Sequence, residues 1–516
     1  MVVAGAAAAP TVAGILDRAA VTAPSTVAVR GPGGEVLSYA DLVASARALG
    51  RALRDRGREP GDRVALWLAD TVPHVQVYAA CALAGFVVVP VNARFTEHEA
   101  RHLVADSGSS ILLSGGATTD RAAALGRSLG LPQMRLDADA DALAALHRRA
   151  ADGDLGEWPA PAPDDPYIIG YTSGTTGAPK GAVLTQGSVA ELARMNALAY
   201  RLPLGSVAAM TGSLSFVAVV PAHVVSHFYV RGTVCLLGPW TVASLLDAVE
   251  THRATFTYVP SPLLAEVADA FAAAPERWRT LTTVLHSASK APEEKLRRLA
   301  DVIGPRLVEG WGMTENSGGL MTVTAPEDVA PGSRRLSTVG RPVPGVDIRL
   351  VAEDGRSVPH DGASVGELVF RSPALMAGYW RDPEATARAL ADGWFRSGDL
   401  GTMDEDGYVT IVERRVDLIV SGGMNVYPFE VEQVLLRHPA VALACVVGVP
   451  HPRWGQTVAA AVVPRPGLPV TEQELVAHCR TYLASYKKPT RIEFMDALPT
   501  TPSLKVSRSA VRRALR

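Results

Sequence analysis

Through its first half the chain alternates short β-branched runs with longer stretches rich in Ala, Leu and Arg. Val27–Val29 and Arg63–Leu68 have the pattern of buried strands, and Ala40–Arg56 between them has the pattern of a helix. A further helix is predicted at Thr96–Ala105 and a further strand at Ser110–Leu113. Such alternation is typical of α/β domains with largely parallel sheets. We therefore expect a large α/β region built on mainly parallel sheets.

The chain has 516 residues, which is too long for one ordinary hydrophobic core. From Gly340 short strands are separated by Gly, Asp and Pro turns, and beyond Arg414 a self-contained α+β pattern begins. About a hundred residues suffice for a separate small domain. We therefore expect an N-terminal domain over residues 1–413 and a small α+β domain over residues 414–516. The strands and helices predicted in the small domain are Leu418–Val420, Pro428–His438, Val441–Val449, Thr457–Val463, Thr471–Leu483 and Arg491–Phe494.

Charge and hydropathy argue against two kinds of partner. The 50 basic and 52 acidic residues nearly cancel, and no block of like charge stands out, so a nucleic-acid partner or an anionic-membrane surface is not expected. The longest apolar run, Ala79–Val91, is shorter than the roughly 20 residues that span a bilayer. It is better interpreted as a helix end, a break at Gly85 and a buried strand, Phe86–Val91. We expect no membrane span.

The cysteines predict neither a disulfide framework nor a structural zinc site. The chain has four of them, far apart and without a C-x-x-C pair. Reduced, buried thiols in a cytoplasmic protein are the expectation. These cysteines are Cys81, Cys235, Cys445 and Cys479.

A segment rich in Gly, Ser and Thr, Tyr171–Gly181, follows a predicted strand, Pro166–Tyr171. It reads Y-T-S-G-T-T-G-A-P-K-G. Its glycines let backbone N–H groups approach an anion, its hydroxyls donate further hydrogen bonds, and Lys180 adds a positive charge. It is not a Walker loop, because Lys180 follows Pro179 and no Ser or Thr follows the lysine. A solvated turn is the usual explanation of such clusters, but the whole string favours a polyphosphate site.

This string matches the signature of the adenylate-forming enzymes almost letter for letter, and the chain resembles that family, which includes acyl-CoA synthetases, luciferases and peptide-synthetase adenylation domains. Further matching segments follow in the same order. The resemblance implies a large N-terminal region and a small mobile C-terminal domain. It also implies that ATP is held by the loop and by a later Ser-Ala-Ser segment. These residues are Thr172, Ser173, Gly174, Thr175, Thr176, Lys180, Ser287, Ala288 and Ser289.

The string Gly310–Glu315 resembles the family's aromatic-Gly-x-Thr-Glu element. The resemblance implies that Trp311 stacks on adenine beside Gly312, that Thr314 contacts phosphate, and that Glu315 binds Mg²⁺. A carboxylate suits this role because Mg²⁺ usually takes one or two of them together with nucleotide phosphates. The segment Gly378-Tyr-Trp resembles the next family motif, which has a largely structural role.

The last motifs extend the resemblance to the end of the chain. Asp399, in W-F-R-S-G-D, would accept hydrogen bonds from both ribose hydroxyls, and Arg414 would contact the ribose and phosphates. Gly422 and Gly423 lie where the family admits the pantetheine arm of CoA. Lys505 stands in the terminal motif and would bridge the attacking carboxylate and the α-phosphate, after which the small domain rotates for the second half-reaction.

The chain departs from the family pattern at three positions. Glu413 replaces the glycine before the hinge arginine, Val416 stands where Asp or Lys is the usual pivot, and Leu504 replaces the glycine before the lysine. All three lie in or beside the predicted mobile domain. They therefore predict an effect on CoA transfer rather than on adenylation.

The acid substrate is constrained by Ser213–Ala218, which occupies the region where amino-acid-activating relatives read S-F-D-x-S, with Phe216 and Val217 in the place of the Phe and the Asp. Val217 cannot pair with an α-ammonium group, and burying that charge unpaired is costly. The other residues that the resemblance assigns to the pocket are small or apolar, which fits a hydrophobic acid. The predicted pocket comprises Phe216, Val217, Val259, Ser261, Gly312, Ser317, Gly318 and Gly319.

The resemblance thus implies a carboxylic acid:CoA ligase that uses ATP, Mg²⁺ and CoA. It would convert a hydrophobic, non-amino-acid carboxylic acid to acyl-AMP with release of pyrophosphate, and then to acyl-CoA. The main alternative is an adenylating ligase that passes the acyl group to a carrier protein or an amine. A luciferase-like oxygenase and a non-catalytic paralogue rank below it, and the paralogue is disfavoured because Lys180, Glu315, Asp399 and Lys505 are all present.

Overall fold

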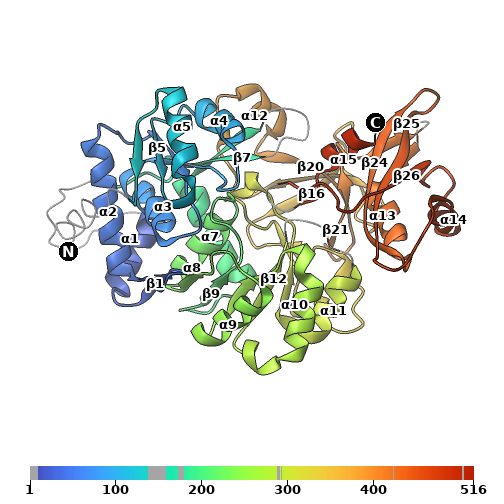
Figure 1. Ribbon diagram of the computed structural model, residues 1–516, viewed down its shortest axis with the longest axis horizontal. Helices are drawn as coiled ribbons and strands as arrows, with labels where there is room; N and C mark the ends of the chain where they lie inside the picture. Colours follow the sequence, from blue (N-terminus) through green and yellow to red (C-terminus); the bar gives the residue numbers. More distant parts are fainter. Residues whose placement is uncertain are drawn as a thin grey trace. The chain divides into compact units, whose positions relative to one another are not determined.

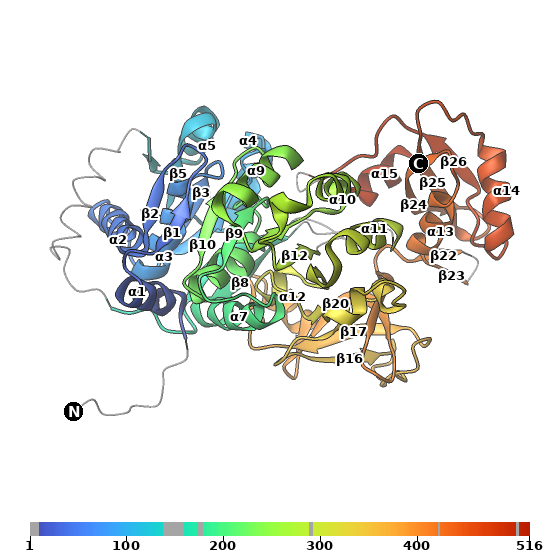
Figure 2. The same cartoon turned by 90° about the horizontal axis from the view of Figure 1, so that it is seen from below.

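The computed structural model describes residues 10–137, 159–172, 179–287, 291, 293–421, 424–501 and 505–515 (Figures 1 and 2). The described residues form two compact units. The first contains the residues up to 347 together with 371–394, and the second contains 348–370 and 395–515. The boundary expected between residues 413 and 414 stays a prediction, because a division into compact units does not show the residue about which one domain rotates.

The first unit is built around two seven-stranded sheets, with strand orders β13-β12-β11-β9-β10-β1-β2 and β18-β8-β7-β4-β3-β5-β6. Neighbouring strands are parallel except for the pairs β1–β2, β7–β8 and β8–β18. The predicted α/β fold with mainly parallel sheets is thus confirmed. The strands of the first sheet are β1 (Val27–Arg30), β2 (Val36–Ser38), β9 (Val207–Met210), β10 (Thr233–Leu236), β11 (Phe256–Tyr258), β12 (Thr283–His286) and β13 (Leu307–Glu309). Those of the second are β3 (Arg63–Trp67), β4 (Val87–Pro90), β5 (Ile111–Ser114), β6 (Gln133–Arg135), β7 (Pro166–Thr172), β8 (Lys180–Thr185) and β18 (Gly378–Tyr379). The shorter strands of this unit are β14 (Thr322–Val323), β15 (Arg341–Pro342) and β19 (Leu390–Ala391).

Helices cover these sheets because each helix has one apolar stripe to bury. Side chains of α9, α10 and α11 form a core with β9, β12 and β13, and side chains of α4 and α5 form another with β3 and β5. The predicted break in the longest apolar run is present: α3 ends at Gly85, whose φ of 75° favours glycine. The helices of this unit are α1 (Val12–Thr22), α2 (Tyr39–Asp55), α3 (Val72–Ala84), α4 (Glu97–Asp106), α5 (Thr119–Leu129), α7 (Gln186–Ala199), α8 (Ser226–Tyr229), α9 (Val242–His252), α10 (Leu264–Ala273), α11 (Glu293–Ile303) and α12 (Pro383–Ala389).

The second unit has two sheets whose strands are mainly antiparallel. One runs β16-β17-β20 with β21 paired to β20, and the other runs β23-β22-β25-β24 with β26 paired in parallel to β25. Helices α13 and α14 bury one face of the second sheet, and α15 buries the opposite face (Figure 2). The strands are β16 (Asp347–Val351), β17 (Gly366–Arg371), β20 (Trp394–Met403), β21 (Val409–Arg414), β22 (Ile419–Ser421), β23 (Met424–Val426), β24 (Val441–His451), β25 (Gly455–Pro464) and β26 (Arg491–Phe494). The helices are α13 (Pro428–Leu436), α14 (Glu472–Tyr482) and α15 (Arg508–Ala514).

The elements predicted for the small domain are all present, and each predicted end lies within two residues of the observed one. Two elements were not predicted, namely β23 and α15. Within α15 Val511 is the buried residue, so the sequence carries too little apolar periodicity to reveal it.

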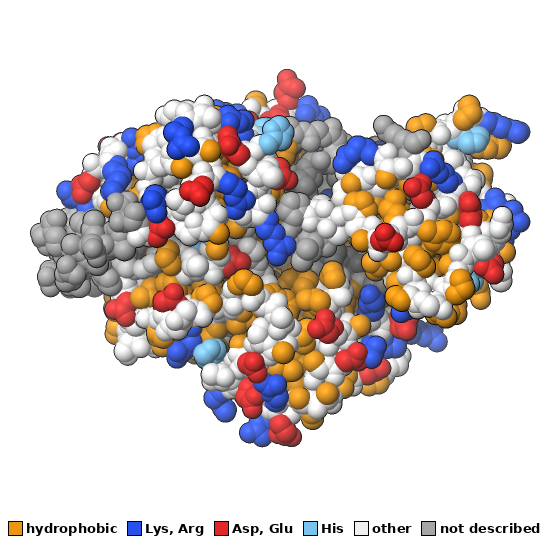
Figure 3. Space-filling view, in the orientation of Figure 1, with side chains coloured by type: hydrophobic (Ala, Val, Ile, Leu, Met, Phe, Trp, Pro, Cys, Tyr) orange, Lys and Arg blue, Asp and Glu red, His pale blue; other side chains and the backbone are white. Residues whose placement is uncertain are grey.

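The charge distribution and the hydropathy of the helices can both be compared with the expectations from the sequence. On the face shown in Figure 3, positive and negative side chains are interspersed. Within the described ranges, no helix combines the length and the apolar character that a membrane crossing requires.

Candidate active site

The ends of the predicted phosphate loop are held by a strand pair. Thr172 at the end of β7 lies opposite Lys180 at the start of β8, and this antiparallel pairing fixes where the loop leaves and re-enters the sheet. Lys180 is thereby placed where the loop re-enters the sheet, at the start of β8. Four loop residues that are predicted to bind ATP lie outside the described residues, namely Ser173, Gly174, Thr175 and Thr176.

The predicted metal ligand Glu315 is linked to Lys180 through a third residue. The hydroxyl of Tyr379 donates to Glu315 Oε1 at 2.9 Å. The Lys180 ammonium lies 5.2 Å from the centroid of the Tyr379 ring, within cation–π range. The structure therefore gathers a lysine and a carboxylate, separated by 135 positions in sequence (315 − 180), around one phenol.

The carboxylate of Glu315 fits Mg²⁺ that arrives with a nucleotide. Glu315 lies in a short 3-10 turn, Thr314–Asn316, so the predicted phosphate contact Thr314 is its neighbour. The described residues contain no group of three or more His, Cys, Asp or Glu side chains that would form a protein-only metal centre. Mg²⁺ is commonly held by one or two carboxylates together with phosphate oxygens and water. A single carboxylate next to a lysine and a hydroxyl matches that arrangement.

The predicted adenine-binding segment continues from β13. The Trp311 residue is buried, and its backbone N–H donates to Thr322 Oγ1 at 3.2 Å. Gly312 forms a β-bridge with Leu320, which brings it against the backbone of the predicted pocket segment. Ser287 follows β12, whereas Ala288 and Ser289 lie outside the described residues.

The segment before Phe216 is held by Asp70. The Asp70 carboxylate accepts hydrogen bonds from the Ser213 hydroxyl at 2.9 Å and from the Leu214 backbone N–H at 2.7 Å. Phe216 itself is partly exposed. Sequence reasoning did not find Asp70, because it lies 143 positions before Ser213.

Two predicted pocket residues come together next to the phosphate-loop strand. A Cβ atom added at Gly170 in β7 would lie 2.5 Å from Cγ1 of Val217, so Val217 occupies that space. Gly318 has φ of 80°, and a Cβ there would lie 2.4 Å from the backbone of Ala218. A side chain at Gly318 would therefore collide with the segment that carries Val217.

At three other predicted pocket residues, the side chain or the space for one is in contact with neighbouring parts of the fold. Val259 is fully buried in the core beneath α10 and α11. The Ser317 hydroxyl is buried and donates to the Ala374 carbonyl at 2.8 Å. At Gly319 an added Cβ would collide with the Leu192 side chain of α7. These contacts describe the surroundings of the three residues, and their assignment to the acid pocket stays a prediction.

A buried polar chain lies next to Ser261, and sequence reasoning missed two of its members. The Ser261 hydroxyl is 2.7 Å from His286 Nε2, and His286 Nδ1 contacts the Glu309 carboxylate. Burial raises the pKa of Glu309, and His286 opposes this effect. The members come from three separate elements, at the ends of β12 and β13 and just after β11. The pocket region is therefore less uniformly apolar than the sequence suggested.

The second unit carries the other predicted nucleotide contacts. Asp399 on β20 lies opposite Arg414 on β21, and Arg414 Nε is 3.1 Å from the Asp399 carboxylate. Lys505 is exposed as a residue, but partial desolvation of its ammonium and the nearby Arg414 charge lower its pKa to about 8, against the opposite effect of Asp399. The structure thus brings Asp399, Arg414 and Lys505 into mutual electrostatic range. Gly422, Gly423 and Leu504 lie outside the described residues.

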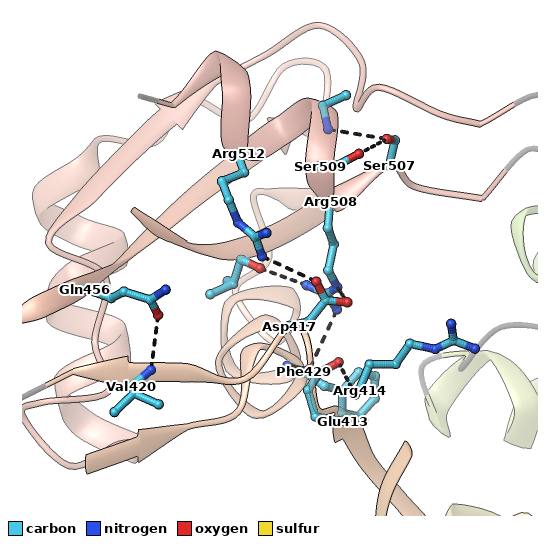
Figure 4. Close-up of polar contacts among 12 residues, drawn as sticks. Glu413, Arg414, Asp417, Val420, Phe429, Gln456, Ser507, Arg508, Ser509 and Arg512 are labelled. Carbon is cyan, nitrogen blue, oxygen red and sulfur yellow. Dashed lines mark hydrogen bonds and ion pairs between the residues drawn. The ribbon is translucent and has the colours of Figure 1, made fainter. Parts of the chain in front are cut away.

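The end of strand β21, which carries Glu413 and Arg414, is connected to helix α15 by buried charged side chains (Figure 4). Glu413 accepts hydrogen bonds from the backbone N–H of Arg414 and of Phe429, both at 3.0 Å. Arg508, at the start of α15, contacts Glu432 of α13 and lies 3.9 Å from Glu413. Burial raises the pKa of Glu413, and Arg508 opposes that shift. Glu413 therefore has a defined structural role at the position where the family has glycine.

Two family models cover most of the chain. The model for the AMP-binding enzyme matches residues 16–380, and the model for the AMP-binding enzyme C-terminal domain matches residues 430–505. The chain belongs to the AMP-binding enzyme family. Membership confirms the predicted adenylate-forming acid–thiol ligase that uses ATP, Mg²⁺ and CoA to activate a carboxylic acid.

Individual relatives within the family are named for different activities. A feruloyl-CoA synthase of Amycolatopsis sp is 38% identical over 504 residues, covering 96% of this chain and 97% of that protein. A fatty acid–[acyl-carrier-protein] ligase, ScoC of Streptomyces coeruleorubidus, is 33% identical and covers 93% of this chain and 92% of its own length. The crystal structure of ATP-bound MatB from Rhodopseudomonas palustris superposes with a TM-score of 0.87 at 28% identity, covering 97% of this chain and 98% of MatB.

Proposed function

We propose that the chain activates a hydrophobic carboxylic acid without an α-ammonium group and transfers its acyl group to CoA. The observation that carries the choice of acid is the position of Val217. Its apolar side chain fills the space next to Gly170, where a relative that activates amino acids would need an anionic partner. An ammonium group buried there would lose its hydration without gaining a counter-charge.

The first half-reaction needs a carboxylate to attack an α-phosphate that is already anionic. The new bond joins the carboxylate oxygen to the α-phosphorus, and the bond to pyrophosphate breaks. Mg²⁺, when bound at Glu315 with ATP, would neutralise charge on the phosphate oxygens. Lys180 supplies a positive charge at the loop, Asp399 accepts from the ribose hydroxyls, and Lys505 stabilises charge as the carboxylate and phosphate approach.

In the second half-reaction the thiol sulfur of CoA attacks the acyl carbonyl carbon and its proton is released to solvent, while the bond from that carbon to the AMP oxygen breaks and AMP leaves with the electron pair. We propose that residues 414–516 move as a unit between the two steps, which would withdraw Lys505 and admit the thiol near Gly422 and Gly423. A cytoplasmic location is part of this proposal, and the four buried cysteines without disulfides support it.

A ligase that acylates a carrier protein is the second candidate, favoured by the 33% identity to ScoC. Both candidates share the adenylation step, so the acceptor decides between them. Adding CoA and a phosphopantetheinylated carrier protein separately to the preformed enzyme–adenylate complex would show which one releases AMP faster.

The choice of acid is tested by pyrophosphate exchange into ATP with matched pairs such as 3-phenylpropanoate and phenylalanine. These two acids differ by an α-ammonium group. We expect exchange with the former and no more than background exchange with the latter. Faster exchange with phenylalanine would contradict the assignment of Val217.

A further inference from the structure

Tyr379 joins two parts of the nucleotide site that lie far apart in the sequence. It belongs to the short strand β18, where it pairs with Ala182 of β8. The next residue, Trp380, donates its backbone N–H to the Gly181 carbonyl at 2.7 Å. The backbone around Tyr379 is therefore attached to the strand that begins at Lys180.

The same segment is attached to the turn that carries the metal ligand. The backbone N–H of Met376 donates to the Glu315 carbonyl at 2.8 Å. The Tyr379 hydroxyl then reaches the Glu315 side chain at 2.9 Å, and the face of its ring lies 5.2 Å from the Lys180 ammonium. The Tyr379 side chain thus contacts the Glu315 carboxylate with its hydroxyl and the Lys180 ammonium with its ring.

The phenol acts as a hydrogen-bond donor at neutral pH. The ordinary pKa of a tyrosine phenol is about 10, so the Tyr379 hydroxyl keeps its proton at that pH. A carboxylate has two oxygens and about four lone-pair sites. The bond from Tyr379 takes one site on Oε1, and a bound Mg²⁺ would take another site of the same carboxylate.

We propose that Tyr379 is a positioning residue for nucleotide binding: its hydroxyl orients Glu315 toward Mg²⁺, and its ring holds Lys180 toward the phosphates. This proposal rests on the proposed role of Glu315. It gives a site function to a motif whose sequence resemblance implied only a structural role.

The hydroxyl is tested with Tyr379→Phe, which keeps the ring and removes the donor. Calorimetry would measure ATP affinity in excess Mg²⁺ and in EDTA, with no acid present, so that binding is separated from turnover. The affinity gain due to Mg²⁺ is the ratio of the ATP affinity in Mg²⁺ to that in EDTA. We expect this gain to fall about 3- to 10-fold, as for the loss of one hydrogen bond to a charged group in a half-exposed site. Affinity in EDTA should not change, because the ring still faces Lys180.

Two reference variants make the result specific. Tyr39→Phe removes another buried phenol, which donates to the Gly232 carbonyl at 2.6 Å, and it should leave the Mg²⁺ gain unchanged. Glu315→Gln should reduce that gain at least as much as Tyr379→Phe. If Glu315→Gln reduces the gain and Tyr379→Phe does not, the proposal for Tyr379 is wrong. If Glu315→Gln has no effect, the assignment of the metal ligand fails instead, and with it the role proposed for the hydroxyl.

The ring is tested with Tyr379→Leu, which removes both contacts. We expect ATP affinity in EDTA to fall about 2- to 5-fold, because Lys180 loses its cation–π partner. An affinity in EDTA equal to that of Tyr379→Phe would refute the role of the ring. A circular-dichroism melting curve identifies any loss of folding, in which case Tyr379→Phe carries the test alone.

Discussion

Replacing Arg508 by methionine should destabilise the second unit strongly, because it would leave carboxylates buried without a counter-charge. The Arg508 side chain is 21% exposed, while Glu432 and Glu413 are only 10% and 7% exposed. Arg508 Nη1 also donates to the Val446 carbonyl at 2.8 Å. Methionine has a similar length and apolar stem, so the change removes charge and hydrogen bonds with little loss of packing volume.

The magnitude follows from the burial of the pair. Breaking a buried ion pair by removing one partner costs about 3–5 kcal/mol. Because Arg508 retains some access to solvent, the lower end applies, and we expect a loss of about 3 kcal/mol. At about 2–4 °C per kcal/mol for a domain of this size, the unfolding transition of the second unit should fall by about 6–12 °C.

The assay needs a signal from this unit alone, since a chain with two units need not unfold in one step. Trp454 is the single tryptophan among residues 395–516. Fluorine NMR of protein labelled with 5-fluorotryptophan would therefore follow its unfolding separately. Arg512→Met is the matched control, because Arg512 lies 3.4 Å from Asp417 and is 27% exposed, and it should cost less than about 1 kcal/mol. A cost below about 1 kcal/mol for Arg508→Met as well would refute the reasoning.

Three further changes test the site itself. Lys505→Ala should slow acyl-adenylate formation about 10²–10³-fold but leave thioester formation from added acyl-AMP nearly unchanged, and equal loss in both half-reactions would contradict the assigned role. Because the ammonium of Lys505 is the active form and its pKa is lowered to about 8, the adenylation rate measured by pyrophosphate release should hold below that pH and fall as pH rises through about 8; a rate still constant at pH 9.5 would exclude Lys505 as the titrating group. Gly318→Ala places a Cβ 2.4 Å from the Ala218 backbone at a positive φ, so we expect weaker acid binding, measured as a raised KM for the acid with the KM for ATP little changed, and an unaltered acid KM would show that the two segments separate freely.

Local sequence patterns predicted the features that depend on neighbours along the chain. The break at Gly85 and the strand leading into the phosphate loop followed from conformational preference and apolar runs. The family motifs also predicted that Asp399, Arg414 and Lys505 belong together, and the structure places their charges within range of one another.

Features that depend on tertiary packing could not be predicted in the same way. Tyr379 reaches Glu315 across 64 positions, and His286 contacts Glu309 only because β12 and β13 are adjacent in the sheet. Val259 is packed in the core with side chains of α10 and α11, a contact that its place in the sequence does not reveal. A local sequence pattern determines neither which distant residues come into contact nor toward which neighbours a single side chain points.

The central claim is that the chain forms an acyl-adenylate and then transfers the acyl group to CoA. It is tested most directly by pyrophosphate exchange into ATP across hydrophobic carboxylic acids, followed by quantification of the CoA thioester with the acid that exchanges best. We predict exchange with at least one such acid and a thioester yield that matches pyrophosphate release. Absence of exchange with every carboxylic acid would contradict adenylation, and exchange without any thioester would contradict CoA as the acceptor.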